Sequence, residues 1–97
     1  MKTIFISFDQ AHYENIVKLL DKLSCKGFTA WEQVIGRGSK GGEPHYGSHA
    51  WPSLSSAMLV VADDDKVNLL LDGLKELDGL RPKLGLRAFV WNVESAI

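Results

Sequence analysis

Residues 36–52, GRGSKGGEPHYGSHAWP, divide this chain into two halves of similar pattern. The stretch shows neither helical nor strand periodicity, and it holds five of the nine glycines and two of the three histidines. Irregular loops of this length are uncommon in a compact domain and are usually functional or disordered. Glycine lets a ligand approach backbone N–H groups closely, and binding residues concentrate on loops. We therefore interpret residues 36–52 as a binding loop, with a plain solvent-exposed connection as the alternative.

Each half of the chain is predicted to form a strand, a helix and a second strand. The strands are predicted over residues 2–8, 28–35, 54–62 and 86–93, where β-branched and aromatic residues dominate. Between them, apolar residues recur at the spacing of one helical face. They are Tyr13, Ile16, Val17, Leu20 and Leu23 in the first half and Val67, Leu70, Leu71, Leu74 and Leu77 in the second. Two such units predict an α+β fold, a ferredoxin-like βαββαβ sandwich with a four-stranded antiparallel sheet and two helices on one face.

Polar residues and glycines mark the expected helix ends. Asp9 is expected to cap the first helix and Gly27 to end it. One of the acids at 63–65 is expected to cap the second helix, and this structural role is favoured over a metal site. Gly73 within that helix lowers its propensity by about 1 kcal/mol relative to alanine.

Both faces of the predicted sheet are apolar. A sheet with one face in water should alternate apolar and polar residues, whereas here Phe5, Leu59 and Trp91 fall on the side opposite the predicted core. Large exposed apolar surfaces mark interfaces. We therefore expect a homo-oligomer packed through the open sheet faces, with three copies able to enclose a common core and to leave clefts between subunits.

Length and composition bound the remaining possibilities. The 97 residues predict a single domain spanning 1–97, and the net charge of -1 argues against a nucleic-acid partner. The single cysteine, Cys25, rules out an internal disulfide and fits a reducing compartment. The apolar run before Asp9 is too short for a signal peptide, and no stretch is long enough to insert into a membrane. A cytoplasmic protein is expected.

The loop and its flanks resemble the PII signal-transduction superfamily, whose members include nitrogen regulators. The chain is most similar to divergent PII-like members, in which a WE.V.GRGSKGG…G.H.WP…S…V pattern recurs. Here the pattern falls on Trp31-Glu32, Val34, Gly36 to Gly42, Gly47, His49, Trp51-Pro52 and Ser56, and the last strand matches at Arg87-Ala88-Phe89-Val90. The resemblance implies a trimer of ferredoxin-like subunits, with residues 36–52 as the partner-binding T-loop.

The resemblance also implies adenine-nucleotide binding in the clefts between subunits. The implied effector-binding residues are Gly36, Arg37, Gly38, Lys40 and Gly41 on the loop and Arg81 and Lys83 before the last strand. Gly36, Gly38 and Gly41 also satisfy G-x-G-x-x-G, but no helix can follow directly, so a Rossmann site is rejected in favour of a looser phosphate cradle. The family's TG..GDGKIF segment is replaced here by GLRPKLGLRAFV.

The loop is expected to contact a regulated protein, a transporter or an enzyme. The candidate contact residues are Lys40, Glu43, His45, Tyr46, His49 and Trp51. Tyr46 stands in the context PHYGS, which does not match the tyrosine that is modified in nitrogen-sensing relatives.

A metal-responsive protein of the same fold is the alternative function. His45 and His49, with Glu43 or with symmetry copies, would supply ligands for Zn²⁺ or Cu²⁺, although exposed histidines without a metal are the favoured interpretation. No carboxylate pair, triad or metal motif stands out, so an enzyme is not expected. Cys25 is interpreted as a small packed residue and not as a nucleophile.

Overall fold

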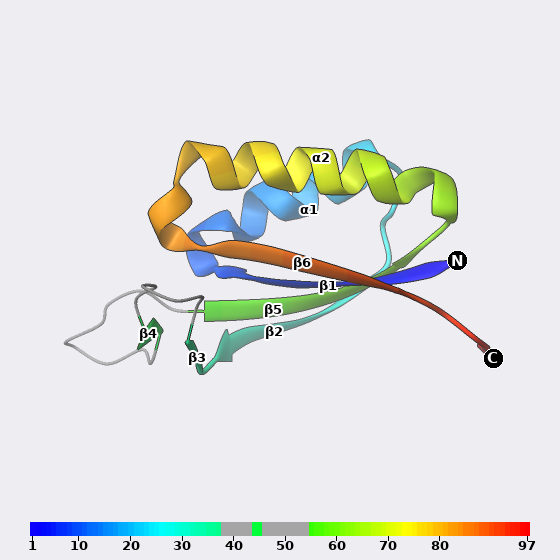
Figure 1. Ribbon diagram of the computed structural model, residues 1–97, viewed down its shortest axis with the longest axis horizontal. Coiled ribbons are helices and arrows are strands. Elements are labelled where there is room, and N and C mark those ends of the chain that lie inside the picture. The colour runs from blue at the N-terminus through cyan, green and yellow to red at the C-terminus, as the bar shows by residue number, and fades with distance from the viewer. Residues whose placement is uncertain (38–43, 46–54) are drawn as a thin grey trace.

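The computed structural model describes residues 1–37, 44–45 and 55–97. In chain order the elements are β1 (Lys2–Asp9), a 3-10 turn η1 (Gln10–His12), α1 (Tyr13–Lys22), β2 (Phe28–Val34), β3 (Gly36–Arg37), β4 (Pro44–His45), β5 (Ser55–Ala62), α2 (Asp64–Leu80), a second 3-10 turn η2 (Pro82–Leu84) and β6 (Leu86–Asn92) (Figure 1). The four long strands and both helices lie where the hydrophobic patterns predict them. The short strands β3 and β4 are additional to that prediction.

The long strands form one antiparallel sheet in the order β2-β5-β1-β6. β1 is central, because it pairs with β5 on one side and with β6 on the other. Both helices cover the same face of this sheet (Figure 1). The predicted ferredoxin-like βαββαβ sandwich is therefore confirmed.

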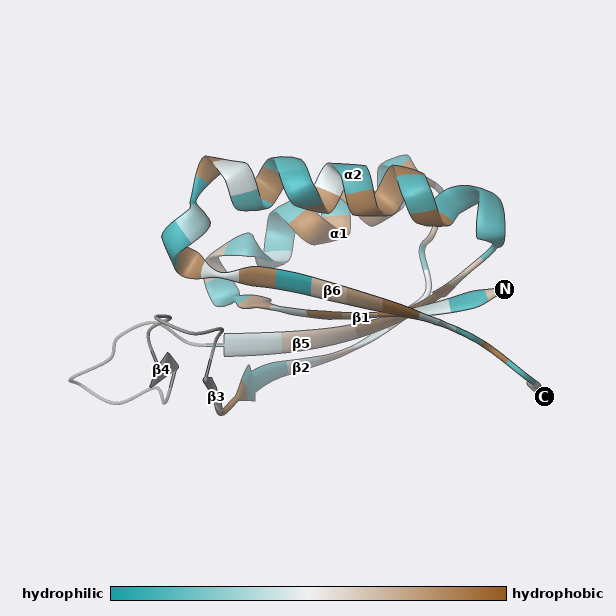
Figure 2. Ribbon diagram, viewed as in Figure 1, coloured by the Kyte–Doolittle hydropathy of each residue, from teal (hydrophilic) through white to brown (hydrophobic). Residues whose placement is uncertain are grey.

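The core lies between the helices and the inner face of the sheet. Ile4 of β1 pairs with Val60 and Val90, so that each strand adds one side chain to the same row. The helices turn their apolar stripes toward this face and their polar residues outward (Figure 2). The largest fully buried side chains include Ile4, Ile6, Phe8, Ile16, Leu20, Met58, Leu70 and Leu74. Within the described part of the chain, no helix is long and apolar enough to cross a membrane.

The outer face of the sheet is apolar and uncovered in a single chain. Strand pairing places Phe5 opposite both Leu59 and Phe89, and Thr3 opposite both Val61 and Trp91. Phe89 is 58% exposed and Trp91 is 49% exposed. The prediction that both faces of the sheet are apolar is confirmed.

Asp9 caps the first helical segment as predicted, whereas Gly27 does not end it. The Oδ1 atom of Asp9 accepts a hydrogen bond from the backbone N–H of Ala11 at 2.8 Å. α1 ends at Lys22, and Ser24 adopts a left-handed φ of 60°. The N–H of Ser24 donates to the Asp21 carbonyl, and that of Cys25 donates to the Leu20 carbonyl. This is the Schellman arrangement, built on a serine instead of the glycine that usually occupies its left-handed position.

Two of the acids at the start of α2, Asp63 and Asp64, play different structural parts. Asp63 occupies the N-cap position, but its side chain makes no capping hydrogen bond. Asp64 instead binds the terminal ammonium of Met1 at 2.8 Å, across a sequence distance that the local pattern could not reveal. The hydrogen bond and the charge of this ammonium hold the pKa of the Asp64 carboxyl below its usual value.

Candidate functional site

The predicted loop and the segment before the last strand leave the sheet at the same end. Ser55, the first residue of β5, pairs with Val34 at the end of β2 and with Asp9 at the end of β1. Beside them, Phe8 pairs with Leu86, the first residue of β6. Residues 36–37, 44–45 and 81–85 therefore gather at one end, which we call the loop end (Figure 1).

The loop begins as a short ladder. Gly36 pairs with His45 and Arg37 pairs with Pro44, so that the backbone of an expected effector residue lies opposite that of an expected metal ligand. Just before the ladder, the register of β2 shifts between Trp31 and Val34. The hydroxyl of Ser56 donates to the Glu32 carbonyl at 2.6 Å across this bulge. Bulges re-aim a strand and are frequent beside functional sites.

The other expected effector residues lie at the opposite edge of the sheet. Arg81 follows α2 and donates its N–H to the Asp78 carbonyl at 3.2 Å. Lys83 lies in η2, and both side chains are exposed. β2 and β6 are the two edge strands, so three strand spacings, roughly 14 Å, separate their ends. Within one chain, the structure brings Arg81 and Lys83 together, but places them well away from Gly36 and Arg37.

A third cation near this edge was not among the expected site residues. The Nη1 atom of Arg87 lies 3.9 Å from Oδ2 of Asp78 and donates to the Leu86 carbonyl at 2.9 Å. Arg87 is the last cation of the sequence RPKLGLR, a spacing that alone does not distinguish it from a solvent-exposed strand residue. The contact with Asp78 shows that its guanidinium lies beside the end of α2.

A match to a family model identifies the chain. The model of "Nitrogen regulatory protein P-II" matches residues 1–97. The chain belongs to the P-II family. The prediction of a divergent PII-like member is thus confirmed. A comparison with curated protein sequences found no match.

Solved structures of PII-like proteins share this fold. CPII of Thiomonas intermedia K12, bound to ADP, AMP and bicarbonate, is 24% identical with a TM-score of 0.76, over 93% of this chain and 82% of that chain. The same protein in its apo form is 20% identical with a TM-score of 0.69, over 93% and 85% of the two chains. A PII-like signalling protein of Thermus thermophilus is 22% identical with a TM-score of 0.68, over 95% and 85%.

The remaining expected residues of the P-II loop lie outside the described residues. These are Gly38, Lys40, Gly41, Glu43, Tyr46, His49 and Trp51. Of the three expected metal ligands, His45 alone falls within the described part, through its backbone in β4. The described residues contain no group of three side chains suited to a metal ion. The metal hypothesis therefore stays a prediction from the sequence.

Two residues at the loop end of this P-II fold, neither of them an expected site residue, each have a buried polar atom without a hydrogen-bond partner among the described residues. His12 is only 4% exposed, and its Nε2 atom is buried without a hydrogen-bond partner among the described residues. Oδ1 of Asp78 is likewise buried and without such a partner. His12 and Asp78 lie in different halves of the sequence, and neither belongs to a local motif that would mark it as functional.

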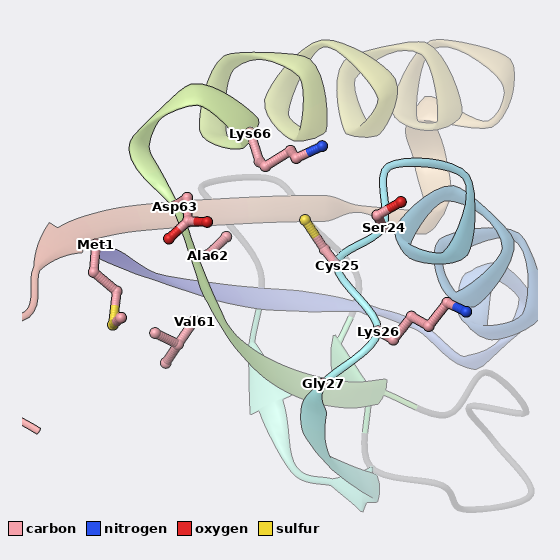
Figure 3. A pocket seen from close by; sticks show the side chains of 9 residues that line it. All are labelled: Met1, Ser24, Cys25, Lys26, Gly27, Val61, Ala62, Asp63 and Lys66. Carbon is pink, nitrogen blue, oxygen red and sulfur yellow. The ribbon is translucent and has the colours of Figure 1, made fainter. Parts of the chain in front are cut away.

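The described residues of this P-II chain form pockets at both ends of the sheet. One, of about 380 Å³, lies beside the loop end and is lined by Gln10, Ala11, Tyr13, Glu14, Asn15, Glu32 and Ser56. Another, of about 210 Å³, lies at the opposite end of the sheet, between the α1–β2 connection and the start of α2 (Figure 3). Cys25 lines it with Lys66, but the thiol is mostly buried and directed to the Leu23 carbonyl at 3.7 Å, which fits the expected packing role.

Proposed function

We propose that this P-II family chain is a trimeric signalling protein that binds an adenine nucleotide in clefts between subunits and controls a partner protein through residues 36–52. The supporting observation is the arrangement of the loop end. It places Gly36 and Arg37 at one edge of the sheet and Arg81 and Lys83 at the other. A ligand that contacts both edges within one chain must span roughly 14 Å, whereas a second subunit could supply one of the two sets of residues.

The uncovered sheet face supports assembly. Phe89 and Trp91 are about half exposed. Phe89 continues the row formed by Phe5 and Leu59, and Trp91 lies opposite Thr3 in the next row of the same face. Leaving such a surface in water is unfavourable by roughly 25 cal/mol for each Å². Packing three such faces together would bury it and would bring the loop end of each subunit beside a neighbour.

The chemistry of the effector follows from the residues at the loop end. Guanidinium and ammonium groups with glycine N–H groups favour a phosphate, since charge-assisted hydrogen bonds to phosphate are among the strongest in proteins. Structures of CPII contain ADP, AMP and bicarbonate, which supports a nucleotide as the first ligand to test. The replaced TG..GDGKIF segment predicts that phosphate contacts come from Arg81 and Lys83 in place of the family's glycines.

Control of a partner follows from the composition of the loop. Fixing five glycines costs more backbone entropy than fixing other residues, so contacts from an effector or a partner must offset that cost. We infer that Lys40, Glu43, His45, Tyr46, His49 and Trp51 supply the contacts to the partner. We further propose that the protein acts as a regulator and not as an enzyme, and that it works in the cytoplasm, where a lone thiol stays reduced.

Calorimetric titration with ADP, AMP and ATP tests this function. Arg37→Ala and Arg81→Ala should each weaken binding by at least about tenfold, because a hydrogen bond to a charged group contributes about 1.5–3 kcal/mol. Lys75→Ala, an exposed change in the middle of α2, is the matched control and should bind like the parent chain. Absence of heat with all three nucleotides would remove this ligand class.

A further inference from the structure

The pocket beside the loop end, of about 380 Å³, plays no part in the proposed nucleotide site. It lies between the residues that start α1, from 10 to 15, and the bulge of β2, where the hydroxyl of Ser56 meets the backbone of Glu32. None of residues 36–37 and 81–83 is among the described residues that line it. Sites for small molecules occupy about 300–1,000 Å³. The pocket therefore has room for a small ligand of its own.

The lining of this pocket is rich in hydrogen-bond acceptors. Glu14 and Glu32 are both lining residues, and an ionised carboxylate accepts hydrogen bonds without donating any. Ser56 is 1% exposed, and its hydroxyl donates to the Glu32 carbonyl at 2.6 Å, which leaves its oxygen able only to accept. None of the described lining residues carries a positive charge. A ligand that satisfies this lining needs hydrogen-bond donors and a positive charge.

The start of α1 acts in the opposite sense, but more weakly. A helix N-terminus carries a partial charge of about +0.5, which attracts anions. Part of its donor capacity is already used, because the N–H of Tyr13 donates to the Gln10 carbonyl in the 3-10 turn before α1. The two carboxylates of Glu14 and Glu32 carry a larger charge of the other sign. The balance of charge in the pocket therefore favours a cation.

An organic cation fits this lining better than a metal ion. A protein site for Ca²⁺ takes about six to eight oxygen ligands, and the described residues contain no group of three side chains suited to a metal. The pocket offers instead the ring of Tyr13, which is half-buried and whose centroid lies 6.3 Å from that of the Phe8 ring. Ammonium and guanidinium groups are attracted to aromatic rings as well as to carboxylates.

We propose that this pocket binds a small organic cation, an alkylammonium or guanidinium compound, through the carboxylates of Glu14 and Glu32 and the ring of Tyr13. Glu32 lies in the bulge of β2, four residues before Gly36, where the ladder of the loop begins. A cation bound there contacts the strand that leads into the loop. Its use as a second signal to the loop rests on the proposed function, whereas the binding itself does not.

Titration of isotope-labelled protein with putrescine, a small diamine, tests the site in the absence of any nucleotide. Saturable shifts of the backbone amide resonances are expected at Glu14, Glu32 and Ser56, and not at Cys25 and Lys66, which line the pocket at the opposite end of the sheet. Butanediol, in which hydroxyls replace the two ammonium groups, should bind at least about fivefold more weakly, since it forms no ion pair. Equal binding of the two compounds, or shifts without saturation, would overturn the proposal.

Charge-neutralising variants locate the cation. Glu14→Gln and Glu32→Gln should each weaken putrescine binding about two- to fivefold, the range for an ion pair that water partly screens, and the double variant should weaken it further. Glu76→Gln, an exposed acid on α2, is the matched control and should bind like the parent chain. Unchanged binding in the double variant, or displacement of putrescine by an equal concentration of CaCl₂, contradicts an organic-cation site. Because no nucleotide is present, neither result bears on the proposed function.

Discussion

Leu19 of α1 lies against Gly73 of α2 so closely that a Cβ atom at Gly73 would stand 2.6 Å from Cδ1 and 2.7 Å from Cδ2 of the leucine. Glycine in a helix costs about 1 kcal/mol relative to alanine, so the sequence alone marks Gly73 as a weakness. The close contact with Leu19 explains why glycine occupies position 73. The missing side chain lets the two helices approach above the sheet.

The change Gly73→Ala should therefore stabilise the protein less than its better helix propensity alone would. The added methyl group forces the half-buried Leu19 side chain to shift, and this cost offsets part or all of the helix-propensity gain of about 1 kcal/mol. Denaturant unfolding measures this change in the free energy of unfolding. Combined with Leu19→Ala, which opens the space, the same change should become favourable by up to about 1 kcal/mol.

The matched control for this prediction is Gly79→Ala near the end of the same helix. A Cβ at Gly79 meets nothing within 4 Å, so the substitution should stabilise the chain by a fraction of the helix-propensity difference. Equal effects at Gly73 and Gly79 would show that propensity, and not contact with Leu19, governs both positions.

Ser24→Gly should stabilise the protein. Ser24 adopts a φ of 60° at the end of α1, a conformation that costs an L-residue about 1–2 kcal/mol and costs glycine almost nothing. Glycine loses more entropy on folding, which reduces the expected gain to about 0.5–1 kcal/mol. The midpoint of urea unfolding should rise, whereas Ser7→Gly within β1 should lower it. A lower unfolding midpoint for both variants would contradict the claim that the backbone at Ser24 is strained.

The sequence predicts the layers of this fold because its strands and helices follow the two regular periodicities. Ile4, Ile6 and Phe8 alternate, and the leucines of α2 recur at helical spacing, so each element identifies its own buried face. The end of α1 at Ser24 could not be predicted in the same way. Serine rarely adopts a left-handed conformation, so Gly27, three residues later, fits the usual sequence pattern of a helix end better.

The candidate site is predictable only where it follows from chain order. Because the strands alternate in direction, residues 36–37 and 81–85 must share one end of the sheet, and this needs no knowledge of side chains. The contact between Asp78 and Arg87 and the burial of His12 depend on how α2 packs against α1 and β6. No local pattern encodes these relationships.

The contact between Met1 and Asp64 should make stability depend on pH. The ammonium lowers the pKa of the Asp64 carboxyl in the folded chain, so the contact stabilises the fold above the unfolded pKa of about 4 and loses this effect as pH falls through the lower folded value. In unfolding curves from pH 7 to pH 2, Asp64→Asn should differ from the parent chain at neutral pH and converge with it at the acidic end. A constant difference between Asp64→Asn and the parent chain from pH 7 to pH 2 would count against the contact.

Charging the outer face of the sheet should break the proposed trimer. Phe89→Glu places a carboxylate among Phe5, Leu59 and Trp91, where packing against other copies would bury it, and a buried unpaired charge costs several kcal/mol. Sedimentation at micromolar concentration should then change from three subunits to one. Leu69→Glu alters a residue of similar exposure, 53%, on α2 and should leave the assembly intact. Dissociation by Leu69→Glu but not by Phe89→Glu would move the interface to the helical face, and a parent chain that sediments as a monomer would remove the intersubunit clefts altogether.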